Sequence, residues 1–220
     1  MTSFQKLLDA QAFPGDPLRG KTMQRGMGRY SLCDRCNTTT GNLYGPHFIA
    51  WTAQGLEHVL QLQHGGLLAL PYRTFPLHVI KQVISMFLSI NPVVFGQRNP
   101  ALREFVLNRT LTGLPPQYRV YCFYTLSSRM RYSPFVYRGG DSPGSLFSEI
   151  AYPPIGYVLT VNSGPPDGRM LEITPFADAR FNEYVELFCQ MPLLPTVNYL
   201  PGTYDTLEEL SALRPDGAEE

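Results

Sequence analysis

Two cysteines separated by two residues are the strongest chemical feature of this sequence. Cys33 and Cys36 are followed directly by Asn37. Thiolates at this spacing can occupy two corners of a tetrahedral zinc site when a tight turn carries them. A structural zinc site needs four ligands, so two more would come from elsewhere in the chain or from a second chain. The sequence therefore predicts half of a zinc knuckle, with Zn²⁺ as a structural cofactor.

The same spacing also occurs in redox-active thiol pairs and in turns that have lost their metal. Redox pairs normally open a helix, whose N-terminus lowers the pKa of the first thiol. The residues after Cys36 are Asn-Thr-Thr-Thr-Gly, a poor start for a helix. A redox role is therefore the less favoured interpretation, and a turn without metal remains the other alternative.

Three residues are candidates for completing the zinc site: His47, Cys122 and Cys189. We include His47 among the expected metal-binding residues, together with Asn37 beside the cysteines. Cys122 falls in a strand-like segment and Cys189 in a helix-like one, and both are expected to be small buried core residues rather than ligands. The other histidines are expected to be solvated or hydrogen-bonded: His58, His64 and His78.

Basic and acidic residues are distributed unevenly along the chain. The 220 residues carry 18 Lys and Arg against 18 Asp and Glu. Residues 1–140 hold 15 of the basic and 5 of the acidic residues, whereas residues 141–220 hold 3 and 13. Most of the basic side chains are arginines, which suit bidentate contacts to phosphate. This division predicts a half that binds nucleic acid, unless the two halves neutralise each other within one globule.

Two groups of basic residues are the candidate nucleic-acid contacts. One group lies in and just after a glycine-rich segment that precedes the cysteines. The other group alternates with aromatic residues along predicted strands, where arginines can bind phosphates and aromatic rings can stack on bases. The same sequence pattern would also arise from buried aromatic residues with arginines at the edge of a sheet. The expected contacts are Arg19, Lys21, Arg25, Arg29, Arg35, Arg119, Arg129 and Arg131.

The order of the predicted elements indicates an α+β protein. Helical patterns cover residues 3–12, 46–62, 77–90 and 99–108. Strand-like runs cover residues 117–126, 129–138, 146–151, 156–161 and 170–173. Ser127 and Ser128 could close a hairpin between the first two strands, and a last helix is predicted at about 178–190. The sequence thus predicts an N-terminal zinc knuckle and helices, then a mostly antiparallel sheet and a closing helix.

We expect three regions along the chain. Residues 1–66 would hold a basic arm, the cysteine knuckle and a helix; residues 67–205 an α+β domain; and residues 206–220 an acidic tail. No apolar run reaches the roughly 17 to 25 residues that span a bilayer, and the N-terminus lacks the apolar core of a signal peptide. A soluble cytoplasmic protein without a membrane partner is therefore expected.

One hydrolase motif can be excluded. Residues 140–144 match G-x-S-x-G, but Pro143 removes the backbone N–H that the oxyanion hole would use, and no histidine follows His78. No glycine-rich phosphate-binding loop occurs either. Serine hydrolysis and nucleotide-phosphate chemistry therefore have no support.

The cysteine segment resembles a known family. Residues 32–37 look like the closing knuckle of HNH endonucleases, whose ββα-metal domain typically ends in a CxxCN or CxxCH element. The longer string CxxCN-x-x-TG-x-x-YG, from Cys33 to Gly45 with Phe48 and Trp51 after it, is similar to a group of bacterial proteins labelled HNH endonucleases. The segments VIKQVISMF, ALREFVLNR, GLPPQYRVY and PPIGYVLT share this likeness.

The resemblance implies roles for individual residues. Cys33 and Cys36 would be structural zinc ligands, and Asn37 would help to hold a catalytic metal. The family's first CxxC and its catalytic Asp-His or His-His pair lie upstream of the closing knuckle, yet residues 1–32 contain no His and no Cys. The general base that activates water is therefore missing.

Three hypotheses follow. The first is an HNH-related, zinc-knuckle protein that is associated with nucleic acid and catalytically degenerate. The second is an active metal-dependent HNH nuclease, completed by sequence upstream of Met1 or by a partner chain. The third is a non-enzymatic interaction subunit, in which basic and acidic halves pair between chains, as in a homo-oligomer.

Overall fold

The computed structural model describes residues 33–62, 70–126, 130–139, 144–194, 196 and 200–204. Within them helices come first and a mostly antiparallel sheet follows, so the predicted α+β class is confirmed. The helix expected at 3–12 and the acidic tail expected at 206–220 lie outside the described residues. Five basic candidates also lie outside them: Arg19, Lys21, Arg25, Arg29 and Arg129.

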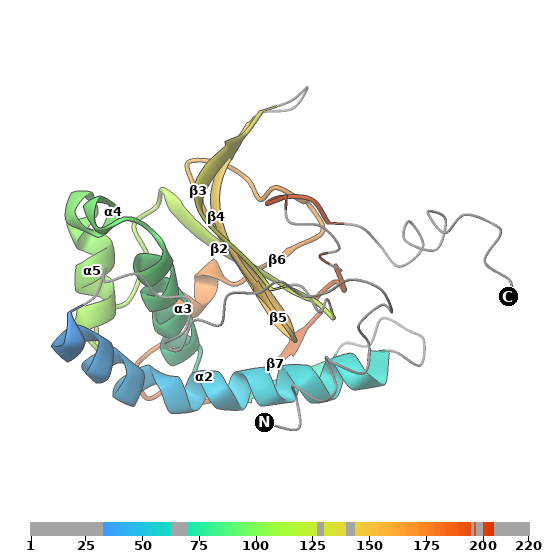
Figure 1. Ribbon diagram of the computed structural model, residues 1–220. Coiled ribbons are helices and arrows are strands. Elements are labelled where there is room, and N and C mark those ends of the chain that lie inside the picture. The colour runs from blue at the N-terminus through green and yellow to red at the C-terminus, as the bar shows by residue number, and fades with distance from the viewer. Residues whose placement is uncertain are drawn as a thin grey trace, which may run out of the picture.

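Four α-helices of the described residues lie on one side of the molecule (Figure 1). The longest, α2 (Asp34–Leu62), runs along the base in this view. The others are α3 (Pro76–Ile90), α4 (Val93–Arg98) and α5 (Pro100–Leu107). The helices predicted at 77–90 and 99–108 are therefore confirmed. None of these four combines the length and the apolar character that a membrane crossing requires.

The helix predicted at 46–62 begins much earlier, at Asp34. Two glycines and Pro46 weaken the helical pattern of this segment. Packing overrides them, because the hydroxyl oxygen of Thr40 lies 3.4 Å from that of Ser85 on α3, and Tyr44 is fully buried. Helices in proteins owe most of their stability to such tertiary contacts, which a local pattern does not reveal.

The main sheet has five strands in the order β3-β4-β5-β2-β6, all antiparallel. They are β2 (Tyr118–Tyr124), β3 (Arg131–Arg138), β4 (Ser145–Tyr152), β5 (Ile155–Val161) and β6 (Leu171–Glu172). Each predicted strand is present, but the predicted hairpin across Ser127 and Ser128 is wrong. β2 is buried on both faces and takes an inner position beside β5, whereas the more exposed β3 lies at the edge beside β4.

A separate two-stranded sheet replaces the predicted closing helix. β1 (Leu70–Thr74) pairs antiparallel with β7 (Val185–Cys189). The helix expected at 178–190 is therefore wrong, and the structure has only a short 3-10 helix, η1 (Thr174–Asp178), just before that segment. Half-buried and exposed residues alternate along β7 with a period of two, which is the pattern of a strand. Pairing with β1 stabilises the segment as a strand rather than as the predicted helix.

One hydrophobic core joins the helices to the near face of the main sheet. Trp51 of α2 belongs to the same buried cluster as Phe87 of α3 and Tyr157 of β5. The Trp51 indole N–H donates to the Tyr157 hydroxyl at 3.0 Å. A smaller cluster covers the other face and includes Tyr204. The boundary expected near residue 66 does not separate two cores, since α2 and α3 share one.

Lys81 is the only Lys, Arg, Asp or Glu of α3, and it is fully buried. Its Nζ donates hydrogen bonds to the carbonyl oxygens of Phe105, of Asn108 at 2.9 Å and of Leu111 at 2.8 Å. These carbonyls lie at and just beyond the C-terminal end of α5, where a helix leaves carbonyl groups without partners. Burial lowers the pKa of Lys81 to about 8. Lys81 thus ties α3 to the end of α5.

Candidate functional site

Cys33 and Cys36 open α2. Cys33 directly precedes the helix, and its carbonyl oxygen accepts a hydrogen bond from the Asn37 N–H at 2.9 Å. The N–H of Cys36 points to Cys33 Sγ at 3.3 Å, which is the contact of an N-cap side chain. The two Sγ atoms lie 2.8 Å apart. The segment expected to be a poor start for a helix therefore begins α2.

The two thiols have different environments. Cys33 is exposed, and hydrogen bonds from the thiol and the N–H of Cys36 lower its pKa. Cys36 is half-buried, and its hydrogen bond to Cys33 together with burial raises its pKa. The positive charges of Arg103 and Arg35 oppose that increase. The arginine side chains of α2 and α5 thus reach the neighbourhood of the thiols.

The described residues do not form a complete metal site. Among them, no three His, Cys, Asp or Glu side chains come together in a group that could hold a metal ion. Cys33 and Cys36 have the chemistry of two of the four ligands, and Asn37 is exposed beside them. His47 is eleven residues beyond Cys36 on the same helix, which corresponds to about 16 Å of helical rise. Its expected role as a ligand beside these cysteines is therefore wrong.

His47 instead lines an open groove beside the start of α3. The groove has a volume of about 400 Å³. Its lining includes Gln54, Arg73, Thr74, Phe75 and Tyr184. The His47 ring lies edge-on to that of His78, with centroids 4.3 Å apart, and burial lowers the pKa of His47. A neutral imidazole among aromatic rings is a packing residue here.

The remaining histidines of the described chain are hydrogen-bonded, as expected. His58 Nδ1 lies 3.2 Å from the Tyr124 hydroxyl. His78 contacts two carbonyl oxygens, Leu43 O at 3.2 Å from Nδ1 and Phe181 O at 2.7 Å from Nε2. His64 lies outside the described residues.

Cys122 and Cys189 are core residues. Cys122 is fully buried in β2, with its Sγ 3.4 Å from Met191 Sδ, which confirms the expected apolar role in a strand. Cys189 is also buried, but in β7 rather than in a helix. Burial raises the pKa of both thiols, that of Cys189 to about 11. Burial and a raised pKa distinguish both thiols from the exposed thiol of Cys33.

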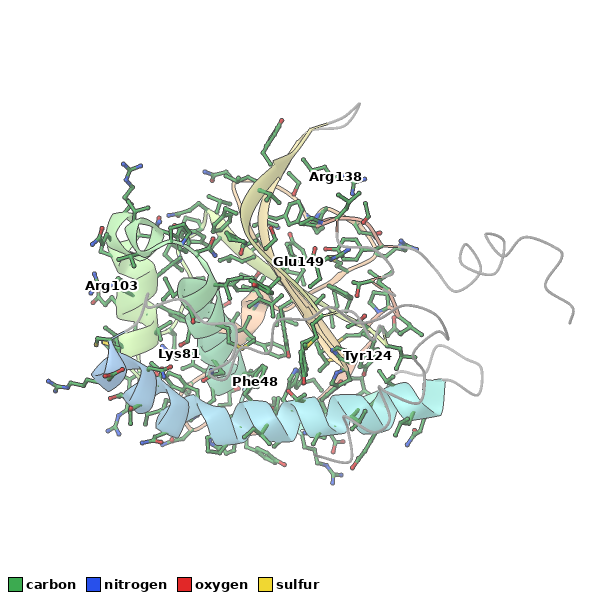
Figure 2. The ribbon with its side chains drawn as sticks, viewed as in Figure 1. Phe48, Lys81, Arg103, Tyr124, Arg138 and Glu149 are labelled. Carbon is green, nitrogen blue, oxygen red and sulfur yellow. The ribbon has the colours of Figure 1, made fainter. Side chains whose placement is uncertain are left out.

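Four exposed arginines lie on the helices or just after α5, and we call this group the arginine edge. Its members are Arg35, Arg98, Arg103 and Arg109. None of them forms an ion pair with a carboxylate of the described residues. Figure 2 shows Arg103 on the side of α5, away from Arg138 beside β3. Arg35 was expected from the sequence, whereas the other three were not.

The arginines of the main sheet are engaged within the protein. Arg131 is 3% exposed and forms an ion pair with the fully buried Glu149. Its expected role as a phosphate contact is therefore wrong. Arg119 is exposed, and its Nη1 lies 3.5 Å from the carboxylate of Glu172. Of the aromatic residues expected to stack on bases, Tyr121 and Phe123 are buried, whereas Tyr132 is 43% exposed.

Comparisons with known proteins leave the chain without an identified relative. It matches no protein-family model, no curated protein and no solved structure.

Proposed function

We propose that this chain is an HNH-endonuclease-related protein that associates with nucleic acid through its arginine edge and does not itself cleave. The observation that carries the proposal is the set of exposed arginines without a carboxylate partner among the described residues. A guanidinium group can bind two phosphate oxygens at once. An arginine whose charge is not already neutralised is free to make that contact.

The charges of the neighbouring residues favour a phosphate ligand. α4 and α5 together carry Arg98 and Arg103 but a single carboxylate, Glu104. By contrast, some exposed arginines elsewhere have carboxylate partners, as in the pairs of Arg73 with Glu186 at 2.6 Å and Arg119 with Glu172. The arginine edge therefore keeps a net positive charge that those pairs do not have.

The sequence before α2 adds further positive charge. Residues 17–32 contain four basic side chains and no acidic one. They are Arg19, Lys21, Arg25 and Arg29. Because they lead directly into the first turn of α2, where Arg35 lies, the chain connects them to the arginine edge.

The proposal that the protein binds nucleic acid without cleaving it is based on which side chains could act in catalysis. HNH chemistry needs a metal ion and a base that activates water. His47, His58 and His78 are packed against rings or hydrogen-bonded, and no metal-binding cluster occurs among the described residues. The two cysteines fit half of a structural zinc site, so no role in the proposed function is assigned to zinc.

The affinity for a short DNA duplex tests this proposal. The double variant Arg98→Gln/Arg103→Gln is expected to bind at least about tenfold more weakly than the wild type in fluorescence anisotropy, a loss of about 1.4 kcal/mol. Arg73→Gln/Arg138→Gln removes the same number of charges away from the arginine edge and should bind like the wild type. Equal affinities for both double variants would contradict the proposal.

A third outcome would favour the interaction subunit instead. In that case the wild type would not bind the duplex, and sedimentation would show a dimer that dissociates at high salt. Pairing between basic and acidic surfaces weakens in this way because salt screens exposed charges.

A further inference from the structure

The two thiols in the first turn of α2 are placed to react with each other. Cys33 and Cys36 are both free thiols, and their sulfur atoms lie 2.8 Å apart. A disulfide requires side chains that converge from nearby backbone positions. The start of α2 already meets this requirement, and no third metal ligand is in place among the described residues to compete for the sulfurs.

The two thiols differ in their exposure and in their position on the helix, and these differences suit them to different roles in exchange. Thiol–disulfide exchange needs an accessible thiol with thiolate character and a second, less accessible thiol nearby. Cys33 is exposed at the N-terminus of a 29-residue helix, where the Cys36 N–H faces its sulfur and the helix dipole favours a negative charge. Cys36 is half-buried one turn later. Asp34 and Arg35 lie in the same first turn of α2.

We infer that Cys33 and Cys36 form a redox-active dithiol that exchanges with disulfides, with Cys33 as the attacking thiol and Cys36 as the resolving thiol. The substrate class is a small-molecule or protein disulfide that can reach the exposed Cys33. The inference does not depend on nucleic-acid binding, since it rests on the first turn of α2 alone.

The reaction balances without a further reagent. The Cys33 thiolate attacks one sulfur of the substrate disulfide, forms a mixed disulfide and releases the first substrate thiolate. The Cys36 thiolate then attacks Cys33 Sγ, which forms the Cys33–Cys36 disulfide and releases the second substrate thiolate. The two protein thiols lose two electrons to the substrate disulfide, and their two protons pass to the released thiolates.

The chain contains its own controls for such exchange. Cys122 and Cys189 are buried in the core, and burial raises the pKa of both thiols. Buried thiols of this kind are inert. They should therefore stay unmodified in the folded protein while Cys33 reacts.

The test uses glutathione disulfide as the probe. The full chain is incubated with it at pH 7, quenched with acid, alkylated and mapped by peptide mass spectrometry. In the wild type we expect an intramolecular Cys33–Cys36 disulfide. In Cys36→Ser we expect a mixed disulfide between Cys33 and glutathione to accumulate, because the resolving thiol is gone. In Cys33→Ser, Cys36 should react at least about tenfold more slowly than Cys33 does in Cys36→Ser.

Three results would overturn the inference. One is a wild type that carries glutathione on both cysteines without forming the disulfide. Another is equal reactivity of the remaining thiol in Cys33→Ser and Cys36→Ser. The third is a zinc ion, measured by mass spectrometry of the untreated protein, that keeps both thiols unreactive until a chelator removes it. Circular dichroism of all variants verifies that they are folded.

Discussion

Lys81 links α3 to the end of α5 through hydrogen bonds. Its ammonium group donates to three backbone carbonyls at the end of α5. Lys81→Met keeps the length of the side chain but removes the donor to these three carbonyls, of which that of Phe105 is buried. We expect the free energy of unfolding at pH 7 to fall by about 1–3 kcal/mol in chemical denaturation. The exposed Arg103→Met is the control and should change it little; an equal effect of both would contradict this role.

Lys81 also makes the free energy of unfolding of the protein depend on pH. Burial lowers its pKa from 10.5 to about 8 in the folded protein. Between these values the unfolded chain binds more protons than the folded one, so the free energy of unfolding rises with pH. We expect the wild type to gain stability relative to Lys81→Met between about pH 8 and pH 10 in denaturation curves. A constant difference across that range would show that the ammonium is not destabilised by burial.

At the scale of elements, a buried ion pair holds the segment 200–204 against the main sheet. Glu149 of β4 pairs with Arg131 of β3 and accepts hydrogen bonds from the Tyr204 hydroxyl at 2.6 Å and the Gly202 N–H at 3.0 Å. Arg131 also donates to the carbonyl oxygen of Leu200 at 2.7 Å. Figure 2 shows Glu149 among the strands. The pair therefore links two strands to the C-terminal segment.

Glu149→Gln should destabilise the protein strongly, because it leaves the Arg131 charge buried without a counter-ion. The expected loss is about 3–5 kcal/mol in the free energy of unfolding, measured by denaturant titration. Glu186→Gln breaks the exposed pair with Arg73 and serves as the matched control, with little or no loss expected. A small loss for Glu149→Gln would mean that the segment is held by apolar packing instead.

Most elements could be predicted from local pattern, and the errors have a common physical origin. The apolar helix at 77–90 and the five strands after residue 117 have strong periodicity or β-propensity. The early start of α2, the position of β3 and the strand at 185–189 depend on partners distant in sequence. Glycines and Pro46 argue against a helix locally, and only packing against α3 reverses that preference.

The candidate site could be predicted only where its residues are neighbours in sequence. The cysteine spacing and Arg35 could be recognised because they are neighbours in sequence. Arg98 and Arg103 lie far along the chain, on α4 and α5, which Figure 1 shows on the side where α2 begins. The only sequence feature that pointed to them was the excess of basic residues in 1–140. Arg131 shows the opposite case, a basic residue that the fold buries.

At the scale of the whole molecule, the central claim is that positive charge at the start of α2 binds a nucleic-acid backbone. Such binding releases counterions, so the logarithm of the affinity falls linearly with that of salt concentration, by about 0.9 for each phosphate neutralised on duplex DNA. The number of arginines in contact with phosphate can therefore be read from the slope.

The most direct measurement is this slope for the wild type and for Arg25→Gln/Arg29→Gln/Arg35→Gln, from anisotropy titrations of a labelled duplex over a range of salt concentrations. The account predicts a steep dependence for the wild type and a slope shallower by about two to three in the variant, since roughly one phosphate contact is lost with each arginine. An unchanged slope in the variant would contradict the claim that the residues leading into α2 contact the phosphate backbone.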